Sequence, residues 1–282
     1  MSQLPSHRPT PKNQFSFSRL KSFDQCPFKY RLRYLKGLKE AFRSIESYLG
    51  NTVHDVLEWM YEERRNGASP DETAIVERFD EGWREDWPED LAIVRIDDGP
   101  DTYFRVGREM LKIFVSDVFD KDRSETLALE ERYSTPLSDR IVFTGFADRV
   151  GRTTKGKLFV IDYKTSKRAG DSTEFSEGLQ APLYAACALE KYKEDSALAG
   201  YHYLRLGISN WHQVDQARAR QLLERFKNLA EAALDTTEFP AKPGILCAWC
   251  GFNHICTFAE VPEAFSGGRK LAQENMGEFS TP

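Results

Sequence analysis

The spacing of hydrophobic residues divides the chain into a helical first part and a strand-rich second part. In the first part apolar residues recur at i, i+3 and i+4, which is the spacing of an amphipathic helix. This pattern predicts helices over residues 18–39, 46–65, 70–85 and 102–119, with an acidic, loop-like segment over 86–100.

From about residue 126 the pattern changes to runs of β-branched and aromatic residues, which favour strands. These runs predict strands over 127–133, 141–150, 158–163, 200–206 and 211–214, a turn over 153–156, and helices over 175–192 and 216–234. Helices that precede and interrupt a set of strands indicate an α/β fold in which a mixed central sheet is flanked by helices.

The order of these elements suggests five segments. We expect a disordered tail over 1–14, an N-terminal helical region over 15–125 that packs on the core, a sheet-containing core over 126–240, a cysteine-rich loop over 241–260 and a flexible tail over 261–282. The two tails are polar or rich in glycine and charge, so they offer little apolar surface to bury.

Composition limits the possible classes of protein. The 282 residues are 40% hydrophobic and 29% charged, which is ordinary for a globular protein. The net charge of −5 does not indicate a nucleic-acid partner unless basic residues are gathered locally. The N-terminus lacks the apolar stretch of a signal peptide, and no run is long enough to cross a bilayer. We therefore expect a cytoplasmic location and no membrane partner.

Two acidic residues and a lysine lie on neighbouring predicted strands. Asp162 and Lys164 are two residues apart at the end of an apolar run, so they share one face of a strand. If the two strands form a hairpin about Lys155, Asp148 lies opposite Asp162 and points the same way. Two converging carboxylates favour a divalent ion such as Mg²⁺ or Mn²⁺. The alternative for Asp162 and Lys164 is an ordinary ion pair at a sheet edge.

Three further residues could extend this site. His54 lies on the predicted helix 46–65 and is either a metal ligand or a hydrogen-bonded core histidine. Gln180 and Tyr184 are four residues apart on a predicted helix, so they face the same way. They could position phosphate, water or Lys164, although a polar residue beside a half-buried tyrosine is equally ordinary.

Three of the five cysteines, Cys247, Cys250 and Cys256, fall within a short loop. Such density is typical of a metal site, and a tetrahedral thiolate site needs a fourth ligand. Cys26, Cys187 and His254 are the candidates. Cys26 is favoured because it follows a turn-like segment, whereas Cys187 looks like a small core residue in mid-helix. Zinc and an iron–sulfur cluster both accept four thiolates, and spacing alone does not separate them.

The first predicted helix carries a run of basic residues. Lys29, Arg31, Arg33 and Lys36 could contact the phosphates of DNA, and the aromatic residues Phe28, Tyr30 and Tyr34 among them could stack on bases. The alternative is a solvated helix face without a ligand.

Taken together and in order, six motifs resemble the RecB-type exonucleases of the PD-(D/E)XK superfamily. The resemblance is closest to members with a four-cysteine [4Fe–4S] cluster, such as the CRISPR-associated adaptation exonucleases and the nuclease domains of bacterial recombination helicase–nucleases. The motifs are the opening from Phe17 to Tyr30, Gly50 to His54, Gly145 to Asp148, Asp162 to Thr165, Gln180 to Tyr184, and the cysteine trio.

The resemblance implies a restriction-endonuclease-like core over 126–240 and a role for each motif. His54, Asp148, Asp162 and the backbone carbonyl of Tyr163 would bind Mg²⁺ or Mn²⁺. Lys164 would be the catalytic lysine, supported by Gln180 and Tyr184. Cys26, Cys247, Cys250 and Cys256 would hold the [4Fe–4S] cluster. Asp148 lacks the preceding proline of the family's signature, because Ala147 stands there.

We therefore expect a metal-dependent DNA exonuclease that acts on single strands or duplex ends in DNA repair, recombination or related processing. One alternative is a non-cutting or partner-activated iron–sulfur subunit that binds DNA within a helicase–nuclease complex. Another is a zinc-stabilised structural protein in which the Asp-x-Lys pair is accidental. The sequence has no Walker-type phosphate loop, so ATP-driven unwinding would need a helicase partner.

Overall fold

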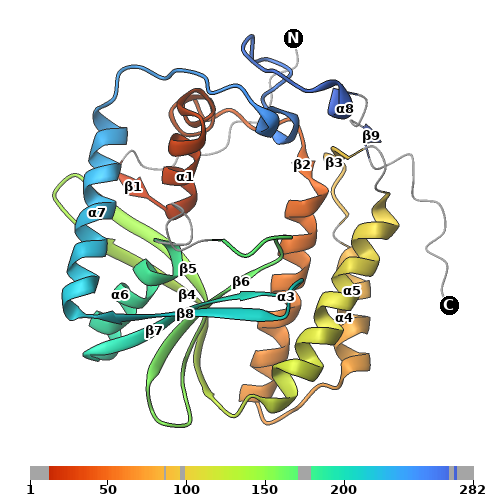
Figure 1. The fold of residues 1–282 in the computed structure, drawn as a ribbon, viewed down its shortest axis with the longest axis vertical. Coiled ribbons are helices and arrows are strands. Elements are labelled where there is room, and N and C mark those ends of the chain that lie inside the picture. Colours follow the sequence, from red (N-terminus) through yellow and green to blue (C-terminus); the bar gives the residue numbers. More distant parts are fainter. Residues whose placement is uncertain (1–12, 86, 96–98, 171–178, 267–269, 272–282) are drawn as a thin grey trace.

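A mixed six-stranded sheet forms the centre of the computed structural model, which describes residues 13–85, 87–95, 99–170, 179–266 and 270–271 (Figure 1). Five strands follow the order β1, β5, β6, β7, β8, and β4 pairs with β5. The strands are β1 (Gln14–Phe15), β4 (Glu125–Pro136), β5 (Val142–Arg152), β6 (Leu158–Lys164), β7 (Ser196–Tyr203) and β8 (Ile208–Asp215).

The connections of the sheet follow from the lengths of the loops. Strands β4, β5 and β6 are antiparallel neighbours joined by short connections, the second of them closed by the hydrogen bond from Gly156 N to Thr153 O. Helix α6 (Gln180–Tyr192) lies between β6 and β7, which are parallel and therefore need a long crossover. The predicted α/β fold with a mixed sheet flanked by helices is confirmed.

Helices cover both faces of the sheet (Figure 1). Helices α6 and α7 (Gln216–Asp235) pack on one face, where Leu183 and Phe226 join a core with Phe143 and Val160. Helices α3 (Ile45–Arg65), α4 (Glu72–Glu85) and α5 (Pro100–Asp117) form a second core with the other face. Within the described residues, none of the helices combines the length and the apolar character needed to cross a membrane.

The sheet has a gap beside β5. Strand β6 pairs with β5 only from Arg149 to Arg152, while β1 pairs with the start of β5 at Val142 and Phe143. Because β4 occupies the other edge of β5, β1 and β6 share one edge and leave residues 144–148 between them without a strand partner there. Backbone and side-chain groups in this gap are therefore available to a site.

The predicted single helix over 18–39 is wrong. The structure has α1 (Phe17–Gln25), α2 (Pro27–Tyr30) and a π-helical turn (Arg31–Leu35), and residues 36–39 are not helical. Cys26 separates α1 from α2 with an extended backbone, φ −160° and ψ 102°. Pro27 explains the break, because a proline disfavours the helical conformation of the residue before it.

Two other predictions need correction at the ends of segments. The stretch 86–100, expected to be a loop, contains the buried strand β3 (Leu91–Ile93), which pairs with β2 (Arg43–Ser44) and β9 (Lys270–Leu271). The expected tail from 261 includes α8 (Glu263–Ser266) and β9, and Gln14 of the expected N-terminal tail begins β1. Most of both tails, and residues 175–178 of the predicted helix 175–192, lie outside the described residues.

Strand and helix limits elsewhere differ by a few residues. The strands predicted at 200–206 and 211–214 occupy 196–203 and 208–215. The cysteine loop docks on the N-terminal segment through backbone hydrogen bonds from Ala41 N to Gly251 O and from Phe28 N to Pro240 O. Gly251 is required at this contact, since a Cβ there would lie 2.5 Å from Glu40 Cβ.

Candidate active site

The predicted pairing of the two aspartates agrees with the register of the hairpin. Arg149 pairs with Ile161, so the next positions along the two strands are Asp148 and Asp162. Both carboxylates, together with Lys164 and His54, line one pocket at the gap beside β5. The alternation along β6 places Asp162 and Lys164 on one face, and Lys164 Nζ lies 2.6 Å from Asp162 Oδ2.

Asp148, His54 and the backbone of Tyr163 are connected directly. Tyr163 N donates a 2.7 Å hydrogen bond to Asp148 Oδ2, which takes the place of the strand pairing that ends at Arg149. His54 Nδ1 lies 3.5 Å from the same oxygen, and His54 Nε2 lies 3.0 Å from the Tyr163 carbonyl oxygen. Three of the predicted metal ligands therefore converge. At Gly50, one turn before His54, an added Cβ would lie 3.4 Å from Thr165 Oγ1, so α3 approaches the end of β6 closely.

Asp162 is the most buried of the acids in this pocket. It is 3% exposed, and its Oδ2 accepts no well-formed hydrogen bond from the described residues apart from the ion-pair contact with Lys164. A buried carboxylate oxygen of this kind is costly unless a cation or donor meets it. The donor set of carboxylates, imidazole and a carbonyl suits a divalent ion, so the residues fit the Mg²⁺ or Mn²⁺ that the sequence implied.

Gln180 and Tyr184 of α6 reach the same pocket from the opposite side of Asp162. Lys164 Nζ donates a 2.8 Å hydrogen bond to Gln180 Oε1, which holds the ammonium group in place. Tyr184 packs over Gly145, where a Cβ would lie 2.6 Å from Tyr184 Cε1. The glycine of the Gly-x-x-Asp motif is thus needed to admit the tyrosine. Burial, followed by the charge of Asp162, raises the pKa of Tyr184 above its ordinary value, so the hydroxyl keeps its proton.

The electrostatics of the pocket favour a bound cation. Burial raises the pKa of Asp148 well above its ordinary value, and the neighbouring charge of Asp162 raises it further. The hydrogen bond from Tyr163 N and the charge of Lys164 act in the other direction but are outweighed. Without a cation, Asp148 therefore tends to hold a proton, and a divalent ion would remove the repulsion.

Glu130 belongs to the site and was missed by the reasoning from sequence. Its carboxylate lies within 4.8 Å of ligand atoms of His54 and Asp148, whereas Asp162 lies outside that trio. Glu130 sits on β4 between the pairs that join Leu129 to Arg149 and Glu131 to Ala147, with a φ of 43°. Burial and the charge of Asp148 raise the pKa of Glu130 to about 7. Only its place opposite the Gly-x-x-Asp strand could have marked it.

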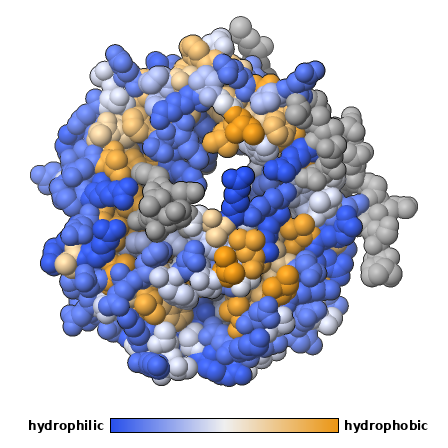
Figure 2. Space-filling view, in the orientation of Figure 1, coloured by the Kyte–Doolittle hydropathy of each residue, from blue (hydrophilic) through white to orange (hydrophobic). Residues whose placement is uncertain are grey.

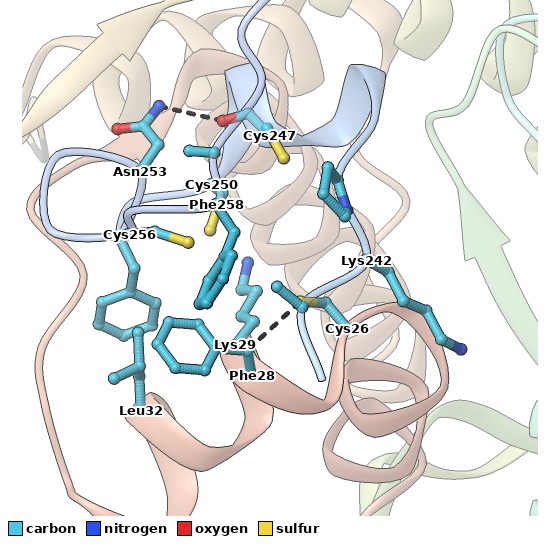
Figure 3. A pocket seen from close by; sticks show the side chains of 14 residues that line it. Cys26, Phe28, Lys29, Leu32, Lys242, Cys247, Cys250, Asn253, Cys256 and Phe258 are labelled. Carbon is cyan, nitrogen blue, oxygen red and sulfur yellow. Dashed lines mark hydrogen bonds between the residues drawn. The ribbon is translucent and has the colours of Figure 1, made fainter. Parts of the chain in front are cut away.

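The four cysteines of the expected metal site line one cavity (Figure 3). Cys26 joins Cys247, Cys250 and Cys256, and Figure 3 shows their sulfurs pointing toward a common space. The other candidates for a fourth ligand are elsewhere. Cys187 is buried on α6, where burial raises the pKa of its thiol to about 12, and His254 is exposed and does not line the cavity.

The cavity is chemically suited to bind a thiolate-ligated group. No carboxylate or histidine is among its lining residues, and Phe28, Leu32 and Phe258 give it apolar walls. Cys26 caps α2, because Lys29 N donates to its Sγ at 3.4 Å. Among the described residues, no three of the sulfurs lie within 4.8 Å of one another. A tetrahedral zinc site needs about 3.8 Å between sulfurs, so the spacing suits a larger group.

The basic run on the N-terminal segment is divided between different surroundings. Lys29 and Arg33 line a pocket and form ion pairs with Glu40 at 3.4 and 2.9 Å. Arg31 lies over the ring of Phe239, and Lys36 is exposed beyond the π-helical turn. Contact of these four residues with DNA remains a prediction.

The aromatic residues expected to stack on bases are not available for it. Tyr30 is fully buried, and Tyr34 packs against the same core. Phe28 meets Phe258 edge to face beside the cysteine cavity, with ring centroids 5.6 Å apart. The error arose because the break at Pro27 turns this side of the segment toward the protein interior.

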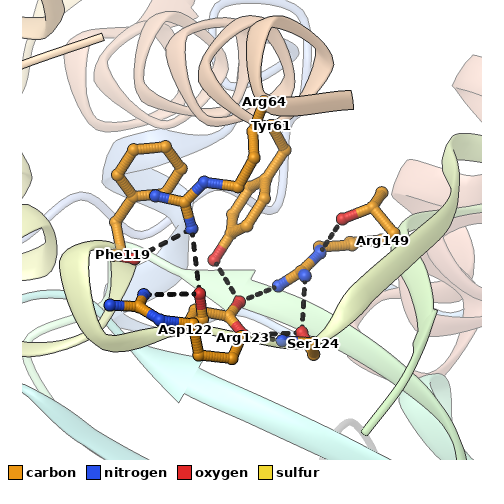
Figure 4. A network of polar contacts seen from close by, with 8 residues as sticks. Tyr61, Arg64, Phe119, Asp122, Arg123, Ser124 and Arg149 are labelled. Carbon is orange, nitrogen blue, oxygen red and sulfur yellow. Dashed lines mark hydrogen bonds and ion pairs between the residues drawn. The ribbon is translucent and has the colours of Figure 1, made fainter. Parts of the chain in front are cut away.

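On the opposite face of the hairpin, Arg149 forms the centre of a second polar cluster (Figure 4). Its guanidinium group donates to Asp122, Ser124 and Thr126 at 2.7 to 2.9 Å and lies 3.7 Å above the ring of Tyr61. The side chain of Tyr163, whose backbone lies in the pocket, interacts with Arg149 and Tyr61. This cluster, which we call the back-face network, anchors β5 and β6 to the helical region.

The fold and the site together define a class of nuclease. Residues 14–257 match the PD-(D/E)XK nuclease superfamily, and the chain belongs to it. Curated relatives within reach of the sequence are named as subunits of an ATP-dependent helicase/deoxyribonuclease, and on that likeness the chain is RecB-like.

The likeness to these relatives is distant and partial. The protein of Streptococcus uberis is 25% identical over 212 residues, which cover 72% of this chain and 19% of the relative. That of Streptococcus agalactiae serotype Ia is 26% identical over 230 residues, covering 77% and 19%. This chain therefore spans about a fifth of the length of the curated relatives it matches. A solved structure titled "Crystal structure of SSO0001" overlaps 89% of this chain and 90% of its own at 14% identity, but its TM-score of 0.39 carries no argument.

Proposed function

We propose that this chain is a divalent-metal-dependent deoxyribonuclease that hydrolyses phosphodiester bonds at the pocket beside β5. The observation that carries the proposal is the meeting of Asp148, Asp162 and Lys164 with His54 in one pocket. Nucleases of this superfamily cut a charged backbone, and these are the groups needed to bind a cation and to face developing phosphate charge. The proposed substrate is DNA, either single-stranded or at a duplex end, degraded as by an exonuclease.

Each residue has a part in the proposed reaction. His54, Asp148, Asp162 and the Tyr163 carbonyl would hold Mg²⁺ or Mn²⁺, which when bound supplies Lewis acidity and lowers the pKa of a coordinated water. Lys164 donates to the non-bridging phosphate oxygens as negative charge accumulates on them. Gln180 keeps Lys164 oriented through their 2.8 Å hydrogen bond. Tyr184 packs beneath Asp162 and keeps water from that side of the carboxylate.

We extend the proposed ligand set by Glu130, which shares the trio with His54 and Asp148. Glu130→Gln is expected to weaken Mn²⁺ binding by roughly tenfold or more, because a carboxylate charge is lost from the ligands. Isothermal titration of the variant with Mn²⁺ measures this independently of activity. Glu125→Gln, an exposed change on the same strand, is the control. Equal Mn²⁺ affinity in parent and Glu130→Gln removes Glu130 from the set.

For the cysteine cavity we propose a [4Fe–4S] cluster held by Cys26, Cys247, Cys250 and Cys256, with zinc as the competing occupant. The wide spacing of the sulfurs and the apolar walls support the cluster. Protein purified without oxygen is expected to contain iron and sulfide in equal amounts and to absorb visible light. Cys26→Ala should lose both, and Cys187→Ala should lose neither. Zinc without iron in the parent would overturn the assignment.

A helicase partner is also proposed. The relatives are named as helicase/deoxyribonuclease subunits, this chain covers about a fifth of them, and it carries no Walker-type loop. Unwinding of a duplex would therefore come from a separate ATPase. The proposed cellular role is DNA repair, recombination or related processing.

The decisive experiment is cleavage of end-labelled DNA, single-stranded and duplex, with Mg²⁺ or Mn²⁺ and with a chelator. Lys164→Ala and Asp162→Asn are expected to lower the rate by at least about a thousandfold, since each removes a group that stabilises the transition state. Lys155→Ala, an exposed lysine in the turn of the same hairpin, is the matched control and should cut like the parent.

Three outcomes count against the proposal. Cleavage that persists in the chelator would exclude the metal, and cleavage by Lys164→Ala at the parental rate would exclude the lysine. Tight DNA binding without cleavage under any metal would favour the non-cutting subunit instead. Release of single nucleotides, as opposed to internal fragments, distinguishes the proposed exonuclease from an endonuclease.

A further inference from the structure

The turn that carries Cys247 has two large apolar side chains on the surface. Residues Ile245–Trp249 form a 3-10 turn, here called the cysteine turn. Ile245 is 59% exposed and Leu246 is 58% exposed, although most apolar residues of this size in the protein are buried. Both side chains, together with Trp249, line the same pocket as Asp148, Asp162 and Lys164. Their position is therefore part of the site and not a random feature of the surface.

We propose that the cysteine turn forms the base-contacting wall of the substrate groove, and that Ile245, Leu246 and Trp249 contact unpaired bases of single-stranded DNA. The inference rests on the proposed nuclease function and names its substrate class. It also gives the cysteine cavity a second consequence, because the group that holds Cys247 and Cys250 positions the turn between them.

The two walls of the pocket differ in chemistry. Lys164, Lys167, Arg95 and Arg205 supply positive charge, whereas the cysteine turn supplies apolar surface. Figure 2 shows a central opening with a hydrophobic upper rim and hydrophilic surface to its right. A nucleic-acid strand has the same division, with phosphates along one side and the apolar faces of its bases along the other.

The groove continues beyond the pocket over Trp249. Trp249 and Ser47 line both the catalytic pocket and the neighbouring pocket that contains Lys29 and Arg33. Lys39 and Arg43 line that second pocket as well, so its basic residues outnumber the acidic Glu40 and Asp90. A strand that passes Trp249 would therefore meet further positive charge, which places two residues of the predicted basic run, Lys29 and Arg33, along its path.

A single strand fits these walls better than a duplex does. In a duplex the base faces are stacked inside and the phosphates are outside, so exposed aliphatic side chains beside the cutting site would have nothing apolar to contact. In a single strand each base offers a π-face to Trp or to an aliphatic side chain. Trp249 is held for such a contact by Phe265, whose ring centroid is 5.1 Å away.

The test measures binding with cleavage disabled, using the full chain with Lys164→Ala as the reference. The probes are a labelled single strand, an abasic strand of the same length, and a duplex. Replacing both Ile245 and Leu246 by Ala is expected to weaken binding of the normal strand by about tenfold and to change binding of the abasic strand less than about twofold. Ile255→Ala, a change at a 50% exposed apolar residue of the same loop outside the pocket, is the control and should change neither.

The abasic comparison separates base contact from damage to the fold. Equal weakening on both strands, or no weakening on either, overturns the inference, as does a loss of the same size with Ile255→Ala. Leu246→Ala alone repeats the test with one exposed change if the double variant loses its cysteine-bound group. Parent protein that fails to cut any DNA with Mn²⁺ would defeat the proposed function. A parent that cuts, with variants that bind both strands as it does, would defeat only the base-contacting wall.

Discussion

Asp148 and Arg149 are neighbours on β5, both charged and both largely buried, yet they lie in opposite kinds of surroundings. Asp148 faces the pocket, where burial and Asp162 raise its pKa and leave its charged form poorly compensated. Arg149 faces the back-face network, where three hydrogen-bond acceptors surround it. Burial lowers the pKa of Arg149, but Tyr163, Tyr61 and Asp122 raise it by more.

The difference teaches where the chain loses stability and where it gains it. The back-face network satisfies its charges within the protein, which is typical of a structural cluster. The pocket leaves its charges to be satisfied by something from outside, which is typical of a functional site. Because one strand carries both residues, the network can hold the pocket in shape while the pocket stays electrostatically strained.

Removing the centre of the back-face network is expected to have the largest effect on stability. Arg149→Met should lower the free energy of unfolding by about 3–5 kcal/mol, because it leaves Asp122 buried without its partner. Urea unfolding followed by circular dichroism measures the loss. The matched control is Arg152→Met at the more exposed end of β5, where loss of the ion pair with Glu194 should cost less than about 1 kcal/mol. Equal losses would mean that burial of Arg149 contributes nothing.

The second prediction uses acid to disturb the back face while the chain is unchanged. Burial lowers the pKa of His202 to about 4, and its Nδ1 lies 2.7 Å from Ser209 Oγ. The unfolded chain binds the proton more readily, so stability should fall as the pH drops from about 6.5 toward about 4, by roughly 3 kcal/mol at most. In His202→Gln this part of the pH dependence should vanish. An unchanged slope in the variant would mean that His202 does not stay neutral in the fold.

The smallest effect should have opposite signs on the two faces. Without metal, Asp148→Asn is expected to raise the free energy of unfolding by about 1 kcal/mol near neutral pH, because it removes a carboxyl whose pKa the fold raises. Asp122→Asn should lower it, since Arg149 and Ser124 outweigh burial and hold the pKa of Asp122 below its ordinary value. Thermal melts in a chelator compare the two. Destabilisation by both variants would remove the contrast between the faces.

The centre of the site could be predicted because local rules determine it. Alternation along one strand placed Lys164 beside Asp162, and the short turn at 153–156 set a register that aligned Asp148 with Asp162. The spacing of four residues brought Gln180 and Tyr184 to the same side of a helix. Each of these steps involves residues close in sequence, so little had to be known about the rest of the fold.

The parts that failed depend on long-range or unusual geometry. Glu130 was missed because its left-handed backbone conformation cannot be read from a strand pattern. The stacking role given to Tyr30 failed because Pro27 breaks the helix and a distant core buries the ring. Ile245 and Leu246 attracted no attention because exposed apolar residues become informative only when the residues across the groove are known.

The docking of the cysteine loop on the N-terminal segment has a consequence for how the protein is made. Cys26 and Cys247 are separated by more than two hundred positions, so they meet only after almost the whole chain has left the ribosome. Contacts between distant positions form late in folding, because a long intervening loop must first be closed. The hairpin that bears the acidic residues can form earlier. A newly made molecule would thus hold its cutting groups before the last wall around them is in place.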